Sequence, residues 1–262
     1  TCAPLLAGDA DLDETVLFER KRLGRAWCSA DAARALHALL RRLHAGRFDW
    51  VLDLQGLLRS ALLAAATAAP LRAGFADARE GAPAFYTHRL AVAAEHTVAR
   101  NIELARRLGT DARADDLTLT VAPAGRQFAE RLAAERGLRP GGFLACVPAT
   151  RWTSKQYPAR HWRAVVTELA KDVPVALLGG PGDRPLCAAI AAGQGPGVVN
   201  LAGQTSVAEL VGAIAASAGV LCCDSAAKFI APAVGVDAVV LIGPTRPERT
   251  GPWPRGWAVV AD

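Results

Sequence analysis

The second half of the chain alternates short apolar runs with longer helix-like segments, and this pattern limits the fold more than any other feature. The runs are apolar throughout, as in strands whose two faces are both buried. We predict strands at 143–147, 173–178, 198–201, 219–222 and 238–242. We predict helices at 159–172, 184–192, 207–218 and 225–234. Such alternation indicates a parallel sheet covered on both faces, so we expect a doubly wound, Rossmann-like domain from about residue 141.

The first half shows the same strand–turn–helix unit less regularly. Helices are predicted at 29–46, 57–68, 95–108 and 124–137, and strands at 50–54 and 117–121. Ser29 can cap the first helix and Gly46 can end it. Residues 72–89 contain glycine, alanine and proline and are predicted as an irregular loop. We therefore expect the α/β class with two domains, 1–140 and 141–262, divided at the breaker 139–142.

The chain is basic, with 30 lysine and arginine residues against 25 acidic residues and a net charge of +5. The arginines are scattered and do not alternate with aromatic residues, which argues against nucleic-acid binding. The positive charge fits an anionic substrate or an anionic membrane surface. No apolar run reaches the ~18 residues that span a bilayer. The six cysteines lack metal-ligand spacing and no secretory signal is visible, so we expect a cytoplasmic protein with reduced thiols and no metal site.

The segment 148–158 follows a predicted strand, at the sheet edge where open α/β sheets bind ligands. It concentrates hydroxyl groups, such as those of Thr150 and Ser154, with the cations Arg151 and Lys155. Such groups hold phosphate oxygens and neutralise a phosphate leaving group. The alternative is a solvated loop whose polar residues are incidental.

The segment 178–183 also follows a strand and precedes a helix. It is not a standard dinucleotide fingerprint, because Pro185 stands at the position of the third glycine. Its glycines, Gly180 among them, permit close approach of a ligand to the backbone, and Asp183 can accept hydrogen bonds from a ribose. The alternative is an ordinary tight turn in which Asp183 caps the helix.

The segment 222–228 ends an apolar strand with Asp224 and Ser225 at the start of a helix. Backbone N–H groups at that position can bind an anion. The alternative is simple capping of the helix by Asp224 or Ser225. No G-x-S-x-G pattern surrounds Ser225, so a hydrolase is not supported, and Cys222 and Cys223 are expected as buried strand residues.

In the first half, the segment 53–60 gathers polar side chains where a strand meets a helix. Together with Arg79, Glu80 and Arg100 it forms a candidate site for an acidic sugar. The alternative is that these arginines only solvate the surface.

In combination, these segments resemble the bacterial lipopolysaccharide heptosyltransferases of glycosyltransferase family 9. The resemblance rests on six elements in the family's order, at 53–60, 78–80, 151–158, 179–183, 224–225 and 243–245. The D-x-Q-G-L-x-(K/R)-S and A-R-E elements are most similar to heptosyltransferase I. The family has the GT-B fold, so the resemblance implies two Rossmann-like domains that face a cleft, here with an incomplete N-terminal domain.

The resemblance also implies a reaction, in which heptose passes from ADP-heptose to the Kdo sugar of the lipopolysaccharide inner core. It implies inversion at the anomeric carbon, no metal and no further cofactor. Implied donor contacts are Thr150 and Lys155 at the diphosphate, Asp183 at the ribose, and Asp224 and Ser225 at phosphate or heptose. The donor site is completed by Arg151, Ser154, Gly180 and Lys228, with Lys155 stabilising the leaving group. Implied acceptor residues are Gln55, Arg59, Arg79 and Arg100, and peripheral contact with the inner membrane is expected.

The chain departs from the family pattern at three places. The family begins with a strand and a glycine-rich loop that ends in an aspartate resembling the catalytic base. The chain contains no methionine, and residues 1–6 resemble a family segment well downstream of that loop. We therefore expect a fragment that is truncated at both ends, and we leave the catalytic base unassigned. Within the family's D-(T/S)-G-x-x-H pattern, Ala226 replaces glycine and Phe229 replaces histidine. The alternatives are a family-9 transferase that uses another nucleotide sugar, and a non-catalytic sugar-nucleotide-binding remnant.

Overall fold

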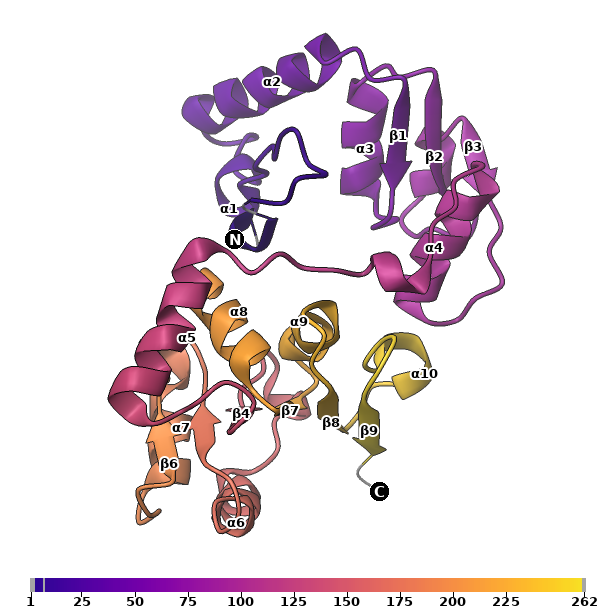
Figure 1. The fold of residues 1–262 in the computed structure, drawn as a ribbon. Helices are drawn as coiled ribbons and strands as arrows, with labels where there is room; N and C mark the ends of the chain where they lie inside the picture. Colours follow the sequence, from indigo (N-terminus) through magenta and orange to yellow (C-terminus); the bar gives the residue numbers. More distant parts are fainter. Residues whose placement is uncertain (1–2, 7, 261–262) are drawn as a thin grey trace. The chain divides into compact units, whose positions relative to one another are not determined.

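The computed structural model describes residues 3–6 and 8–260, which fall into two compact units (Figure 1). The N-terminal unit comprises residues 16–113, and the C-terminal unit comprises residues 114–260 with the described residues before 16. The unit boundary therefore precedes the predicted one at residue 140. The reason is that helix α5 (Pro123–Arg136) packs against α8 (Val207–Ala216), with its side chains Phe128 and Leu132 in the same core as Val211 and Ile214.

The C-terminal unit is built on one parallel sheet of six strands in the order β6-β5-β4-β7-β8-β9. The strands are β4 (Leu144–Val147), β5 (Val175–Leu177), β6 (Val198–Asn200), β7 (Gly219–Cys223), β8 (Ala238–Ile242) and β9 (Trp257–Val260). The first five confirm the predicted strands. Strand order reverses between β4 and β7, as in dinucleotide-binding folds. The prediction missed β9, an exposed edge strand that follows only the single-turn helix α10 (Pro247–Thr250).

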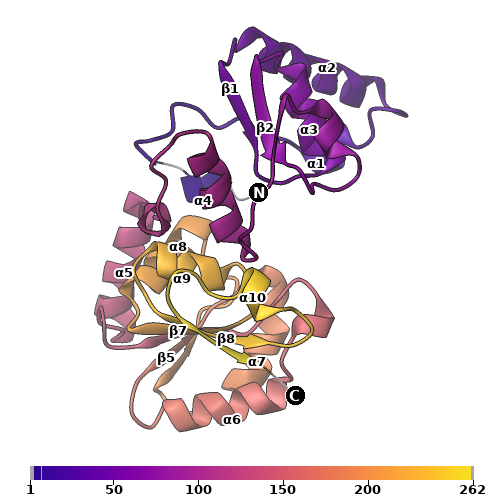
Figure 2. The ribbon, with the colours of Figure 1, turned by 90° about the vertical axis from the view of Figure 1, so that its right-hand side faces the viewer.

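Helices cover both faces of this sheet, as Figure 2 shows for α8 and α9 (Ala227–Ala233) on one side and α6 (Ala159–Leu169) on the other. Neighbouring residues of β4 point to opposite faces: Ala145 and Val147 join the core under α5, α8 and α9, and Cys146 joins the other core. That second core contains Trp162 of α6 and residues of α7 (Arg184–Ala191). The alternation explains why the central strands β4, β5, β7 and β8 are apolar throughout, because they bury both of their faces.

The N-terminal unit contains a parallel sheet of three strands in the order β1-β2-β3, formed by Trp50–Asp53, Leu71–Phe75 and His88–Leu90. Its helices are α1 (Arg20–Leu23), α2 (Ala30–Ala45), α3 (Leu58–Ala66) and α4 (Thr97–Arg107). Helix α2 begins after Ser29, whose hydroxyl accepts from the Ala32 backbone N–H, and it is followed by Gly46, as predicted. The predicted helices at 57–68 and 95–108 are confirmed as α3 and α4.

Two predictions for the connecting segments are wrong. The predicted loop 72–89 contains most of β2, the short 3-10 helix Ala82–Phe85 and the start of β3. Gly74 is needed for packing, because a Cβ at this position would lie 2.3 Å from Cε2 of Tyr86. In the described structure 117–121 is not a strand: the Leu119 backbone N–H donates to the carbonyl of Ala233 at the end of α9 instead of joining a sheet.

Candidate functional site

The loops that follow β4 and β7 leave the C-terminal unit's sheet where its strand order reverses. In open α/β sheets, ligands bind outside the carboxyl ends of the strands at this position. The β4 loop carries Lys155, the β7 loop carries Asp224, and Lys228 lies in the first turn of α9. Parallel pairing of β4 with β7 thus brings together residues that are 69 positions apart in the sequence.

Asp224 is the centre of a buried polar cluster. Its Oδ2 atom accepts hydrogen bonds from Lys155 Nζ at 2.6 Å and from Thr245 Oγ1 at 2.7 Å. Its Oδ1 atom accepts from Nζ of Lys228. Both carboxylate oxygens therefore accept hydrogen bonds from residues of this chain. Thr245, from the loop after β8, was not among the predicted site residues.

The cluster strongly favours the ionised form of Asp224. Burial alone would raise the pKa of this carboxyl group, but the hydrogen bonds from Lys155, Lys228 and Thr245 outweigh it and lower the pKa to about 2. With two lysines around one carboxylate, the cluster keeps an excess of one positive charge. An anionic ligand would be attracted to this excess charge.

The two lysines differ in how they are placed. The Lys228 side chain is 4% exposed, whereas that of Lys155 is 25% exposed. Lys228 Nζ also lies 4.8 Å from the centroid of the Phe229 ring, within cation–π range. Lys155 can consequently reach a ligand in solvent, whereas Lys228 is enclosed.

The rest of the β4 loop turns tightly on itself. Thr150 Oγ1 accepts from the Trp152 backbone N–H at 3.1 Å, and the Arg151 guanidinium lies 5.7 Å from the Trp152 ring centroid. Arg151 and Ser154 are exposed. A cavity of about 420 Å³ lies beside this loop, with Lys155, Tyr157, His161 and Gly243 in its wall. Its size suits a small organic ligand.

The β5 loop forms a closed turn. Asp183 Oδ2 accepts from the Gly180 backbone N–H at 2.8 Å, and a Cβ on Gly179 would lie 2.9 Å from Cβ of Asp183. Glycine at 179 therefore leaves room for the aspartate to close the turn. The structure thus assigns Asp183 a local role in the turn, and its predicted ribose contact stays a prediction.

The alternative interpretation of this segment, simple capping of the helix by Asp224 or Ser225, is wrong. The residue that caps α9 is Ala226, which makes no side-chain cap bond, so neither Asp224 nor Ser225 caps the helix. The Ser225 hydroxyl is buried and has no hydrogen-bond partner among the described residues. Cys222 and Cys223 are buried strand residues, as predicted, and burial raises the pKa of the Cys222 thiol to about 12.

In the N-terminal unit, Asp53 organises the loop that carries Gln55 and leads to α3, whose second residue is Arg59. Its Oδ1 atom accepts from the backbone N–H groups of Gln55 and Gly56, both at 3.0 Å. Its Oδ2 atom accepts from Ser60 Oγ at 2.8 Å and from the Tyr86 hydroxyl at 2.7 Å. Burial and this hydrogen bond raise the pKa of Tyr86 above its ordinary value. Asp53 is thus a structural centre that joins β1, α3 and the segment before β3.

The four predicted acceptor residues lie around this loop. Gln55, Arg59 and Arg79 are exposed, and the Arg79 backbone N–H donates to the Gly56 carbonyl. Arg100 is less accessible, because its guanidinium pairs with Asp77 at 2.5 Å and lies 4.8 Å from the Phe75 ring centroid. Gln55 and Arg79 therefore present polar groups after the carboxyl ends of β1 and β2. The Arg59 guanidinium instead lies 5.9 Å from the Phe18 ring centroid and lines a groove with residues of α1 and α2, and Arg100 supports the loop that carries Asp77.

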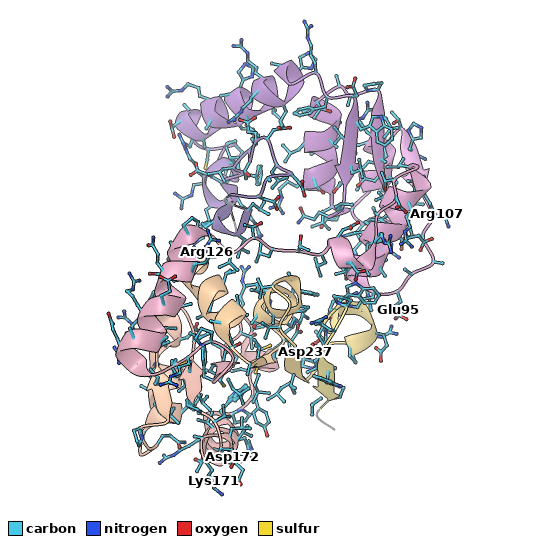
Figure 3. The ribbon with its side chains drawn as sticks, in the orientation of Figure 1. Glu95, Arg107, Arg126, Lys171, Asp172 and Asp237 are labelled. Carbon is cyan, nitrogen blue, oxygen red and sulfur yellow. The ribbon has the colours of Figure 1, made fainter. Side chains whose placement is uncertain are left out.

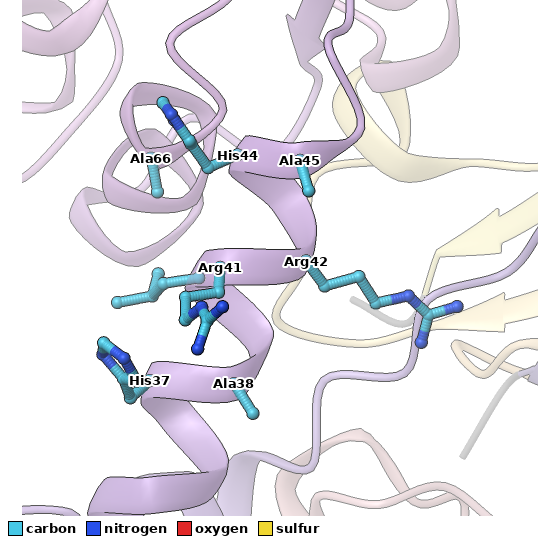
Figure 4. Close-up of a pocket in the computed structure, with 8 residues that line it drawn as sticks. His37, Ala38, Arg41, Arg42, His44, Ala45 and Ala66 are labelled. Carbon is cyan, nitrogen blue, oxygen red and sulfur yellow. The ribbon is translucent and has the colours of Figure 1, made fainter.

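Helix α2 borders a separate basic groove of about 750 Å³ in the N-terminal unit (Figure 4). His37 and Arg41 lie on the same side of the helix, whereas Arg42 points to another side. Among the described residues, no group of three or more His, Cys, Asp or Glu side chains is arranged to hold a metal ion. Nor does the described part of the chain contain a helix that is long and apolar enough to cross a membrane.

Comparison with known sequences assigns most of the chain to one family. Residues 36–261 match the family described as glycosyltransferase family 9 (heptosyltransferase). Lipopolysaccharide heptosyltransferase 1 of Escherichia coli is 26% identical over 249 residues, which are 92% of this chain and 75% of that protein. The same enzyme of Salmonella typhimurium is 25% identical over 250 residues, again 92% of this chain and 75% of that protein.

Comparison with solved structures agrees with this assignment. The E. coli heptosyltransferase WaaC with ADP matches with a TM-score of 0.78 and 25% identity, over 97% of this chain and 79% of that one. A family 9 glycosyltransferase from Veillonella parvula has the same fold, with a TM-score of 0.76 at 22% identity over 87% of this chain and 67% of that one. The predicted α/β class and GT-B fold are confirmed by the match to WaaC. The chain belongs to glycosyltransferase family 9, the heptosyltransferases.

Proposed function

We propose that this glycosyltransferase moves heptose from ADP-heptose to the Kdo sugar of the lipopolysaccharide inner core, with inversion and without a metal ion. The observation that carries the proposal is the cluster of Lys155, Asp224 and Lys228 at the reversal point of a Rossmann-like sheet. Such a position suits a nucleotide diphosphate. The structure of the E. coli relative with 25% identity contains ADP, which supports an adenine nucleotide as the leaving group of the donor.

In this proposal, Lys155 neutralises the charge that develops on the diphosphate as it leaves. A general base takes the proton of the acceptor hydroxyl as its oxygen attacks C1 of heptose, so that the new C1–O bond forms and the bond from C1 to the ADP oxygen breaks. Lys155, whose side chain is 25% exposed, is placed to donate a charge-assisted hydrogen bond from Nζ to the departing oxygens. A lysine in this role supplies the charge that a divalent cation supplies in other transferases. No described residue is assigned as the base.

The proposed donor and acceptor residues follow from the sequence elements and their placement. Thr150, Arg151 and Ser154 share the β4 loop with Lys155, and Gly180 and Asp183 belong to the neighbouring β5 loop. We assign Gln55, Arg59 and Arg79 to the anionic acceptor, because they are exposed beside the Asp53-centred loop. A net charge of +5 suits an anionic lipid-linked acceptor, so we propose that the reaction occurs at the cytoplasmic face of the inner membrane.

A second candidate is a family 9 transferase that uses a different sugar on the same nucleotide. Phe229 favours it, because its aromatic ring stands at the position where the family pattern has a histidine. An apolar ring at that position changes the surface that a donor sugar would meet.

A transfer assay with the full chain separates these candidates. We expect ADP-heptose and a Kdo-containing lipid acceptor to give a heptosylated product by mass spectrometry, with the same yield when EDTA removes divalent ions. ADP-glucose and UDP-glucose serve as control donors. Transfer from another ADP-sugar in preference to ADP-heptose would support the second candidate, and loss of transfer with EDTA would contradict metal independence.

A further inference from the structure

We propose that Lys228 is a positioning residue, a buried counter-charge that keeps Asp224 paired and so leaves Lys155 free to bind the donor diphosphate. The inference rests on the proposed function, because it assigns Lys155 to the diphosphate. It goes beyond that function because it gives a role to Lys228, which lies in the segment 224–229 where the chain differs from the family pattern.

The geometry divides the Asp224 carboxylate between the two lysines. Lys228 is bonded to Oδ1, and Lys155 is bonded to Oδ2, which also accepts from Thr245. If Lys155 turns away to a ligand, Oδ1 keeps the ammonium group of Lys228 and Oδ2 keeps the Thr245 hydroxyl. Asp224 therefore stays satisfied in either state of Lys155.

Without Lys228 the same movement would be unfavourable. Asp224 is 7% exposed, and a buried carboxylate that loses its only cation is strongly destabilised. Lys155 would then be held at Asp224 and would compete poorly for a phosphate. The net charge of the cluster would also fall from one positive charge to none, which removes its attraction for an anion.

A direct contact between Lys228 and the ligand fits the structure less well. The Lys228 side chain is 4% exposed, its ammonium group points to Asp224, and the Phe229 ring covers it at 4.8 Å. By contrast, the Lys155 side chain is 25% exposed and lines the cavity beside the β4 loop. Lys228 is thus placed to act through Asp224, and Lys155 is placed to meet the ligand.

The test compares the full-length wild type with Lys228→Met and with the double variant Lys228→Met/Asp224→Asn. The first probe is ADP, titrated by calorimetry. We expect Lys228→Met to weaken ADP binding by at least about tenfold, which corresponds to ~1.4 kcal/mol. The Asp224→Asn change removes the charge that would hold Lys155, so we expect the double variant to recover to within about threefold of the wild type. Circular dichroism and thermal melting confirm that each variant is folded.

The second probe needs no nucleotide and reports on Lys155 itself. Reductive methylation, followed by mass spectrometry, gives the labelling rate of each lysine. Lys21 and Lys171 are exposed and serve as internal references, and Lys171 lies beyond the end of α6 (Figure 3). We expect Lys155 to label several times more slowly in Lys228→Met, because its ammonium group would stay in the ion pair with Asp224, and to regain its rate in the double variant.

The outcomes separate this inference from the proposed function. Unchanged Lys155 labelling in Lys228→Met would overturn the inference, and so would an ADP-binding loss that Asp224→Asn does not recover. If labelling slows and recovers but the wild type does not bind ADP, the positioning role holds and the proposed nucleotide function fails.

Discussion

Replacing Asp224 with alanine is expected to lower the free energy of unfolding by about 3–5 kcal/mol, the cost of breaking a buried ion pair by removing one partner. The substitution leaves Lys228 as a buried ammonium group whose side chain is 4% exposed. It also removes the acceptor of Thr245 and Lys155. Urea unfolding followed by far-UV circular dichroism would measure the change.

Asp172→Ala is the matched control, because Asp172 is exposed beyond the end of α6 (Figure 3). We expect that variant to stay within about 0.5 kcal/mol of the wild type. Equal stability of Asp224→Ala and Asp172→Ala would contradict the arrangement of the cluster.

The same carboxylate should make stability depend on acid. Its pKa is lowered from the ordinary 3.8 to about 2 in the folded chain, so its ionised form stabilises the fold at any pH above the ordinary value. That contribution, roughly 2 kcal/mol, is lost as the pH falls from about 4 toward 2. The stability difference between the wild type and Asp224→Asn should therefore narrow over this range.

Replacing Lys155 with alanine is expected to reduce kcat/KM for ADP-heptose by at least tenfold, because charge-assisted hydrogen bonds contribute about 1.5–3 kcal/mol. Lys155 is the more exposed of the two lysines on Asp224, so its loss removes the cation nearest to a bound diphosphate. Asp224 keeps Lys228 and Thr245, so the fold should survive. Steady-state kinetics of the transfer reaction would measure the effect.

Lys171→Ala provides the control for this substitution. Lys171 is exposed. Among the described residues, its ammonium group forms an ion pair only with Glu168, at 2.7 Å on the surface. Its loss should leave kcat/KM unchanged. Unchanged kinetics in Lys155→Ala would remove Lys155 from the proposed mechanism.

Much of the C-terminal fold could be predicted from the sequence, because each buried strand there is short, apolar and followed by a helix-length segment. The secondary-structure predictions are wrong where tertiary contacts determine the local structure. The segment around Gly74 has the composition of a loop, yet it forms a strand because its missing side chain makes room for Tyr86. The edge strand β9 is exposed along its whole length, so no buried run marked it in the sequence.

The candidate site was predictable only in part. The sequence indicates polar loops after each strand, and Lys155, Asp224 and Lys228 were all among the predicted residues. The sequence does not indicate that these three side chains are in contact. Lys155 lies 69 positions from Asp224 and is brought to it by the pairing of β4 with β7. Thr245 was missed as a site residue for the same reason, because it lies 21 positions beyond Asp224 and reaches the cluster from the loop after β8.

A calorimetric titration of this chain with ADP-heptose, with ADP and UDP-glucose as comparisons, tests most directly whether the C-terminal unit binds the proposed donor. We expect saturable binding of ADP-heptose and ADP, no comparable binding of UDP-glucose, and binding at least about tenfold weaker in Lys155→Ala. Absence of binding to either adenine nucleotide by a folded chain would contradict this expectation and would favour a non-catalytic remnant of the family.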